Sequence, residues 1–106
     1  RFAASWVEQR QAGKPRSRRA LANELREKGV AREIVETTLE EAEIDEVADA
    51  RRLAADKWRK DADLELDKRR QRTAAFLGRR GYGWDVARQV IDELARGEDP
   101  DDFEPR

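Results

Sequence analysis

The sequence contains neither cysteine nor histidine. Their absence excludes disulfides, thiol nucleophiles, Ser-His-Asp triads, and zinc or haem sites built from those ligands. No apolar run approaches the ~20 residues that a membrane span requires, so we expect no contact with a membrane. Cytoplasmic proteins typically lack disulfide-bonded cysteines and a secretory leader, in which basic residues precede an apolar segment. This sequence has neither feature. We therefore expect a cytoplasmic protein without cofactor or metal, for which most hydrolytic and redox chemistry is excluded.

Proline and glycine are also scarce, with 3 and 6 residues among 106. Charged residues make up 44% of the chain, and many of the others are alanine and leucine. Because these residue types favour helices, the composition predicts an all-α protein of one domain or two very small units. The net charge of −1 is unevenly distributed, because two mildly basic segments, residues 1–42 and 50–95, alternate with acidic segments at 43–49 and 96–106.

The two basic segments resemble each other. A shift of 52 residues superposes positions of similar size or character. The matched pairs are Leu25 with Leu77, Lys28 with Arg80, Gly29 with Gly81, Val35 with Ala87, Leu39 with Ile91, and Arg18 with Arg70. A shared basic residue, glycine and apolar residue, followed by the same apolar spacing, indicates an internal repeat.

Each copy is predicted to form three helices. Apolar stripes at helical spacing occupy residues 2–7, 21–25 and 34–42 in the first copy, and 47–58, 66–77 and 86–94 in the second. Gly29 follows the second stripe as a left-handed cap residue, whereas the start of the third helix near Ala31 lacks a good cap. We expect the large apolar residues on these stripes to build the core, namely Phe2, Trp6, Ile34, Trp58, Leu66 and Phe76, and we expect Trp84 to join them.

The boundary between the copies has the weakest signal, because neither glycine nor proline occurs between Gly29 and Gly78. We place the break near residues 43–45, where Asp45 would cap the next helix. One continuous long helix across this segment is the alternative. The division predicted is a three-helix repeat at residues 1–43, a second at 44–96, and an acidic, mobile tail at 97–106.

Two such units should depend on each other. A unit of about 45 residues buries some eight to ten apolar side chains at ~1.5–3 kcal/mol each, which barely offsets an ordering entropy of ~1.5 kcal/mol per residue. We expect the units to stack into an elongated, curved, monomeric body, whose long surface suits binding along a filament or groove.

Three segments of the first copy carry a family resemblance. They are Phe2-Ala3-Ala4-Ser5-Trp6-Val7-Glu8-Gln9-Arg10, Gly13-Lys14-Pro15-Arg16-Ser17 and Glu24-Leu25-Arg26-Glu27-Lys28-Gly29-Val30. In order and spacing they resemble the second repeat of the RecX family of bacterial RecA modulators, and the residues from Ala50 onward resemble its third repeat. The resemblance implies tandem three-helix repeats that bind the RecA filament on single-stranded DNA and inhibit or destabilise it, within recombination, DNA repair and the SOS response. The first repeat that the family normally has is missing from this sequence.

Basic residues recur at matching places in the two copies. They are Arg16, Arg18 and Arg19 in the first, and Lys68, Arg69, Arg70, Arg72, Arg79 and Arg80 in the second. On stacked repeats they would form a stripe that meets phosphates or the acidic rim of a protein groove. We expect protein contact to dominate, with weak or indirect binding of single-stranded DNA, and we expect Arg69, Arg70 and Arg72 to be exposed. For any single residue, an ordinary solvated face is the alternative.

Two other functions fit the sequence less well. The main alternative is a stand-alone helix-turn-helix module with weak, non-specific DNA affinity, but its reading helix would expose Glu33, Glu36 and Glu40, which repel phosphates. A cation site among the acidic residues of segment 61–67 lacks the glycine and the bidentate glutamate of a calcium loop. We therefore expect a binding protein and not an enzyme.

Overall fold

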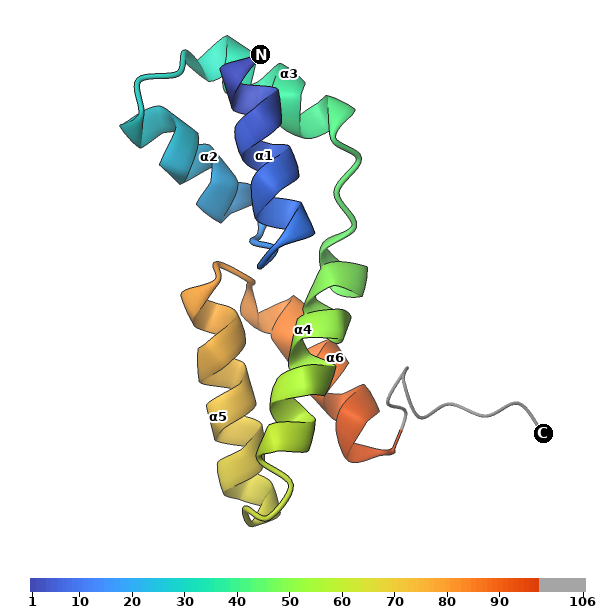
Figure 1. Ribbon diagram of the computed structural model, residues 1–106. Helices are drawn as coiled ribbons and strands as arrows, with labels where there is room; N and C mark the ends of the chain where they lie inside the picture. The colour runs from blue at the N-terminus through green and yellow to red at the C-terminus, as the bar shows by residue number, and fades with distance from the viewer. Residues whose placement is uncertain (98–106) are drawn as a thin grey trace, which may run out of the picture.

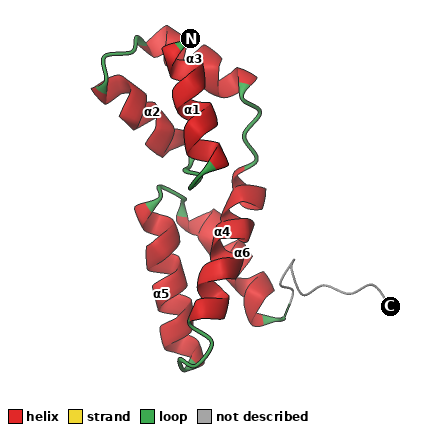
Figure 2. Cartoon of the chain, in the orientation of Figure 1, coloured by secondary structure: helices red, strands yellow, loops and turns green. Residues whose placement is uncertain are grey.

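The computed structural model describes residues 1–97, which form six helices and contain no strand (Figures 1 and 2). The first unit contains α1 (Phe2–Ala12), α2 (Arg18–Glu27) and α3 (Arg32–Glu41). The second contains α4 (Glu46–Lys60), α5 (Leu66–Arg79) and α6 (Trp84–Ala95). The all-α fold with two successive three-helix units is as predicted. No helix among the described residues is long and apolar enough to span a membrane. The predicted tail, apart from Gly97, lies outside the described residues.

The helix starts follow the capping residues in the sequence. The Ser17 side chain accepts a hydrogen bond from the Ala20 N–H at 3.1 Å at the start of α2, and Asp45 accepts one from the Ala48 N–H at 3.1 Å at the start of α4. Between α3 and α4, Glu43 has a φ of 52°, which no helix residue adopts. The predicted break is therefore confirmed, and the alternative of one long helix is wrong. As expected, Ala31, which precedes α3, provides no side-chain cap for it.

The internal repeat is visible in the backbone where α2 and α5 end. Gly29 and Gly81 both have positive φ values, 87° and 92°. The following residue donates its N–H back into the helix in both copies, from Val30 to the Leu25 carbonyl at 3.0 Å and from Tyr82 to the Leu77 carbonyl at 3.2 Å. These bonds form the usual glycine-dependent helix end, and the shift of 52 residues relates them directly.

Each unit has its own hydrophobic core. Seven buried apolar residues form the first core: Ala3, Val7, Leu21, Leu25, Val35, Leu39 and Ile44. Ten form the second: Ala50, Ala54, Ala55, Trp58, Leu77, Tyr82, Ala87, Val90, Ile91 and Leu94. The second unit also has the longer helices, of 15, 14 and 12 residues against 11, 10 and 10. Ile44, just beyond the predicted boundary, packs into the first core, and the domain boundary itself stays a prediction.

Four large apolar residues that we expected in the core are more than half exposed, so those assignments are wrong. They are Phe2, Ile34, Leu66 and Trp84. Three of the four are the first residue of their helix, α1, α5 and α6 respectively. Helical spacing gives the direction of a side chain, but a residue at a helix end has few neighbours to cover it. Trp58 is buried as predicted, and Trp6 and Phe76 are half-buried against the two cores.

The two units meet through a close backbone contact. The Ser17 N–H donates to the Arg80 carbonyl at 3.2 Å, which brings the start of α2 against the turn after α5. A Cβ atom on Gly81 would lie 2.5 Å from the Ser17 Oγ and 2.6 Å from the Ala20 Cβ. Only glycine therefore fits this contact, which we call the joint.

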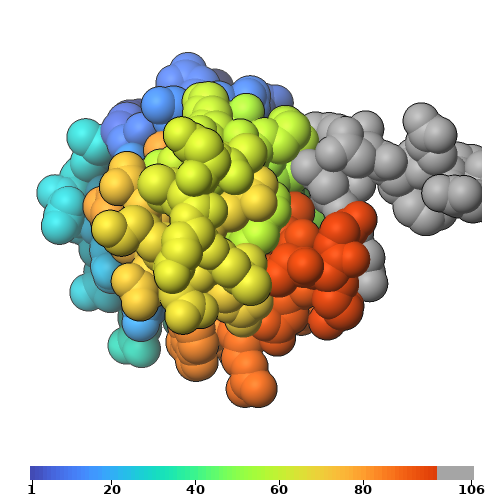
Figure 3. All heavy atoms as spheres, turned by 90° about the horizontal axis from the view of Figure 1, so that it is seen from below, coloured from blue at the N-terminus to red at the C-terminus, as the bar shows by residue number. Residues whose placement is uncertain are grey.

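Polar side chains reinforce the joint. The Gln11 amide donates to the Asp49 carboxylate at 3.1 Å, and the Arg18 N–H donates to the Glu46 carboxylate at 2.6 Å. The Arg18 guanidinium also donates to the Ile44 carbonyl. The units are thereby held end to end in an elongated body of 44 × 31 × 21 Å. Viewed along the long axis, the second unit presents the α4–α5 turn and α5 in front, with α6 beside them (Figure 3).

Candidate binding surface

The predicted basic residues lie on α2 and α5, which follow one another along the same side of the molecule (Figure 1). Arg18 and Arg19 begin α2, and Arg16 lies two residues before it. Arg79 ends α5, and Arg80 follows it at the joint. The remaining four, Lys68, Arg69, Arg70 and Arg72, lie in the first half of α5. The end of α5 and the start of α2 are thus brought together, whereas the start of α5 is far along the body.

Two of the α5 arginines are not free, so our expectation that they are exposed is wrong. Arg69 donates to the Trp58 carbonyl at 2.9 and 2.6 Å, and its guanidinium lies 4.0 Å from the centre of the Trp58 ring. That carbonyl is among the last four of α4, which have no partner within the helix. Arg70 pairs with Asp92 on α6 at 2.6 Å. The hydrogen bond from Arg70 lowers the pKa of the Asp92 carboxyl.

Arg69 is expected to stabilise the fold. Arg69→Ala removes the hydrogen bonds to the Trp58 carbonyl and the contact with the ring, and should lower the free energy of unfolding by ~1–3 kcal/mol. Arg72→Ala is the control, because its side chain is 57% exposed and lies 3.6 Å from Asp61, so less than ~1 kcal/mol is expected. Urea denaturation measures both values. Equal stability losses for the two variants would contradict the assignment.

Arginines from both units meet at the joint. Arg16 pairs with Glu24 at 3.2 Å. The Arg80 guanidinium lies 4.2 Å from the centre of the Phe76 ring. Burial lowers the pKa of Arg80, and the positive charges of Arg16 and Arg79 lower it further. The joint therefore brings three arginines together, although the carboxylates of Glu46 and Asp49 also lie at the joint.

Two further cations belong to this surface and were missed in the sequence. Arg10 pairs with Glu24 at 3.1 Å and lies 4.9 Å from the centre of the Trp6 ring. Lys28 lies 4.4 Å from the centre of the same ring, whose indole N–H donates to Glu24 at 2.8 Å. The spacing of four residues between Trp6 and Arg10 on one helix was the available signal. We call the cations joined in this way the cationic band: Arg10, Arg16, Lys28, Arg79 and Arg80.

The acidic segment between α4 and α5 serves the fold. Asp61 is buried and forms ion pairs with Lys57 at 3.1 Å and with Arg72 at 3.6 Å. Among residues 1–97, no group of acidic side chains is arranged to hold a metal ion. The segment 61–67 thus connects two helices, and Glu65 caps α5 by accepting a hydrogen bond from the Lys68 N–H at 3.4 Å.

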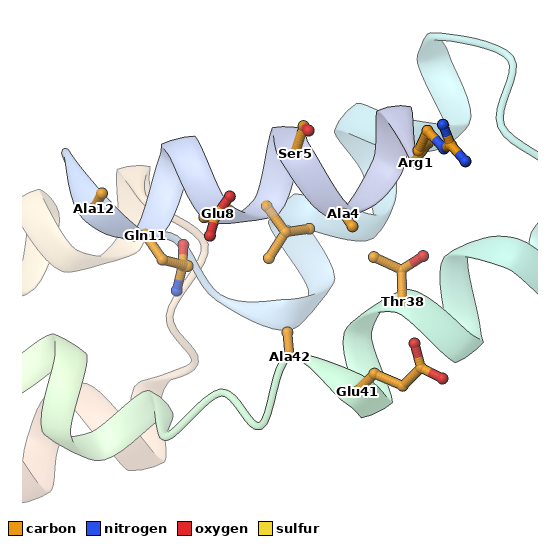
Figure 4. A pocket seen from close by; sticks show the side chains of 10 residues that line it. Arg1, Ala4, Ser5, Glu8, Gln11, Ala12, Thr38, Glu41 and Ala42 are labelled. Carbon is orange, nitrogen blue, oxygen red and sulfur yellow. The ribbon is translucent and has the colours of Figure 1, made fainter.

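A groove runs between α1 and α3 (Figure 4). Its ionisable side chains are Arg1, Glu8 and Glu41, and the two glutamates come from opposite helices. Ser5 and Thr38 supply hydroxyls, but neither hydroxyl forms a hydrogen bond with the Glu8 or Glu41 carboxylate. The groove therefore lacks the constellation of a nucleophile and its base.

Comparison with known proteins gives matches to both units. The second three-helix domain of RecX matches residues 1–39, and the third three-helix domain of RecX matches residues 43–91. Regulatory protein RecX of Streptomyces coelicolor is 38% identical over 101 residues, which cover 94% of this chain and 54% of that protein. Regulatory protein RecX of Mycobacterium marinum is 44% identical over 103 residues, which cover 92% of this chain and 58% of that protein. No solved structure matches.

The two domain matches follow each other in the order of the family and coincide with the two three-helix units of the fold. The chain spans a little over half the length of the curated relatives it matches. The chain belongs to the RecX family of regulatory proteins.

Proposed function

We propose that the chain is a non-catalytic modulator of the RecA recombinase. It binds the RecA filament on single-stranded DNA as a monomer, in the cytoplasm, and inhibits or destabilises the filament, which regulates recombination and DNA repair. The observation that carries this proposal is the match of both units, in family order, to the second and third domains of RecX. The nine predicted basic residues stay candidates for the contact.

The shape of the molecule supports a filament as partner. Two units joined end to end give a body 44 Å long, along one side of which α2 and α5 follow each other (Figure 1). A long surface with several separate contacts suits a repetitive partner, because each contact adds to the binding without the enclosure that a small substrate needs.

The helix-turn-helix alternative is weaker in the structure than the filament proposal. The helix that would enter the major groove in the first unit is α3, on which Glu33, Glu36 and Glu40 are exposed. Among residues 1–97, only Glu36 of these three has an ion-pair partner, Arg32 at 3.5 Å, and both side chains are largely exposed. Carboxylates on that face would repel the phosphates on both sides of the groove.

Co-sedimentation tests the proposal. The chain is mixed with RecA assembled on single-stranded DNA with a non-hydrolysable nucleotide, and in parallel with the same DNA without RecA. We expect much more of the chain in the pellet when RecA is present, and shorter filaments when RecA assembles with hydrolysable nucleotide. Equal pelleting with and without RecA would contradict the filament proposal and favour a plain DNA-binding module.

A further inference from the structure

The two units differ where the first and third helices of each unit meet. In the first unit a groove of about 680 Å³ lies between α1 and α3 (Figure 4). The shift of 52 residues relates Thr38 and Ala42 on α3 to Val90 and Leu94 on α6. Val90 and Leu94 are buried, whereas Thr38 is partly exposed and Ala42 is exposed. The second unit therefore fills with its own side chains a space that the first unit leaves open.

The same difference appears on the first helix of each unit. A shift of 51 residues relates the buried residue Val7 on α1 to the buried residue Trp58 on α4. Val7 lines the groove, so a small side chain stands there in place of an indole ring. Lining atoms of an open groove lack van der Waals partners, and an apolar side chain from another molecule would supply them.

The charges along the groove are also incomplete. Glu93 on α6 pairs with Arg51 on α4 at 2.9 Å. Its counterpart in the first unit is Glu41, which lines the groove together with Glu8. Neither Glu41 nor Glu8 forms an ion pair within residues 1–97. An occupant that brings both a cation and a large apolar side chain would supply what the first unit lacks.

The start of α6 exposes this combination. Trp84 is 66% exposed, more than any other large apolar residue within the described part of the chain. Arg88 lies one helical turn later on the same face, and its side chain is 69% exposed. The carboxylate closest to pairing with it, Asp92 at 3.9 Å, is held more tightly by Arg70 at 2.6 Å. Trp84 lines a hollow between α5 and α6 and is not among the residues that line the groove of its own chain.

We propose that the groove between α1 and α3 binds a second copy of this chain. Trp84 of that copy lies between the two helices, and its Arg88 pairs with the carboxylates of Glu8 and Glu41. Because the contact joins two different surfaces, it is head-to-tail and can repeat along a row of copies. One ring and one cation bury little area, so we expect a Kd on the order of 1 mM and a monomer in dilute solution.

The contact is a property of this chain alone. Only its consequence rests on the proposed function, because copies held side by side on a filament would bind cooperatively even through a weak contact.

Nuclear magnetic resonance of the isotope-labelled chain of 12.3 kDa tests the contact without RecA. Spectra are recorded between about 0.02 and 1 mM, a range that reaches the expected Kd. We expect the indole N–H signal of Trp84 and the amide signals of Ala4 and Ala42 to shift with concentration. The indole signal of Trp58, which is buried in the second core, is the internal control and should not move. The mean mass from sedimentation equilibrium should rise about twofold at the highest concentration.

Charge reversal identifies the two sides of the contact. Glu41→Arg and Arg88→Glu each bring like charges together, so either variant alone should associate at least about tenfold more weakly than the parent chain. An equal mixture of the two variants should associate again. In the mixture the two substituted side chains attract each other, and the two unsubstituted ones do as well. The control variants Glu40→Arg and Arg26→Glu make the same charge changes at exposed positions outside the groove and α6, and should associate like the parent.

Two further variants change the shape of the contact and not its charge. Trp84→Ala removes the exposed ring and should weaken association at least about tenfold. Thr38→Val with Ala42→Leu gives the first unit the side chains of the second, which should close the groove and cause a similar loss.

Several results would overturn the proposal. They are spectra that stay constant over the whole concentration range, association that Trp84→Ala leaves unchanged, and a mixture of the charge variants that associates no better than each alone. An equal loss in Glu40→Arg would mean that net charge and not the groove governs association. Circular dichroism confirms that each variant is folded, and Trp84→Ala and Arg88→Glu decide the question if the groove variants are not, because both positions are exposed. A failure of the filament proposal leaves all of these measurements unaffected.

Discussion

Leu77→Ala is expected to lower the free energy of unfolding by ~2–5 kcal/mol, and Leu25→Ala by a similar amount. Both leucines have no exposed surface and occupy equivalent positions in the second and first cores. The substitution removes three buried carbon atoms and leaves a cavity that the neighbouring helices fill only in part. Chemical denaturation followed by circular dichroism gives both values.

Each substitution should weaken both units, although their cores are separate. The first unit buries seven apolar residues, too few for firm stability alone, and the joint connects it to the second. Tryptophan fluorescence can follow the first unit in a background with Trp58→Phe and Trp84→Phe, because Trp6 is then the only tryptophan. We expect Leu77→Ala to lower the denaturation midpoint reported by Trp6 as well. Independent units would give a different result. The denaturation midpoint reported by Trp6 would then fall in Leu25→Ala and stay unchanged in Leu77→Ala.

Gly81→Ala is expected to be much more damaging than Gly29→Ala, although the shift of 52 residues relates the two positions. Both glycines have φ near +90°, so alanine costs ~1–2 kcal/mol at either one. Around Gly29 no atom lies within 4 Å of an added Cβ, whereas at Gly81 the added atom would overlap Ser17 and Ala20. Relieving that overlap should cost a further ~1–3 kcal/mol and move the units apart.

Two measurements separate these effects. Thermal denaturation compares the stabilities of the two glycine variants, and small-angle X-ray scattering reports their shape. We expect Gly29→Ala to keep the radius of gyration of the parent chain and Gly81→Ala to increase it. If both variants lose the same stability and keep the same shape, the joint adapts to a methyl group and the close approach of Gly81 is not required.

Much of the fold could be predicted from the sequence, because it depends on local signals. Gly29 and Gly81 mark two equivalent helix ends, and Asp45 caps α4 where no glycine or proline marks the break. Helical spacing gave the correct direction for most apolar residues, including Leu25, Leu77 and Trp58. It failed at the first residues of helices, such as Leu66 and Trp84, since their exposure depends on what lies beyond the helix end.

The candidate surface was less predictable. Whether an arginine is free depends on partners far along the chain, such as the Trp58 carbonyl for Arg69 and Asp92 for Arg70. A run of basic residues in the sequence carries no signal of such pairing. The cluster at the joint is equally non-local, because Arg16 and Arg80 are separated by 64 positions and meet only when the units dock.

The inequality of the two cores has a consequence for folding during synthesis. The smaller core, with seven buried apolar residues, leaves the ribosome before the larger one, with ten. Its joint to the second unit needs Gly81 and the Arg80 carbonyl, which emerge about 40 residues after the first core is complete. At ~5–20 residues per second, the first unit must wait seconds for the contact that stabilises it. In that interval the first unit is exposed to proteases and chaperones. The chain becomes resistant to them only when the second unit has folded and formed the joint.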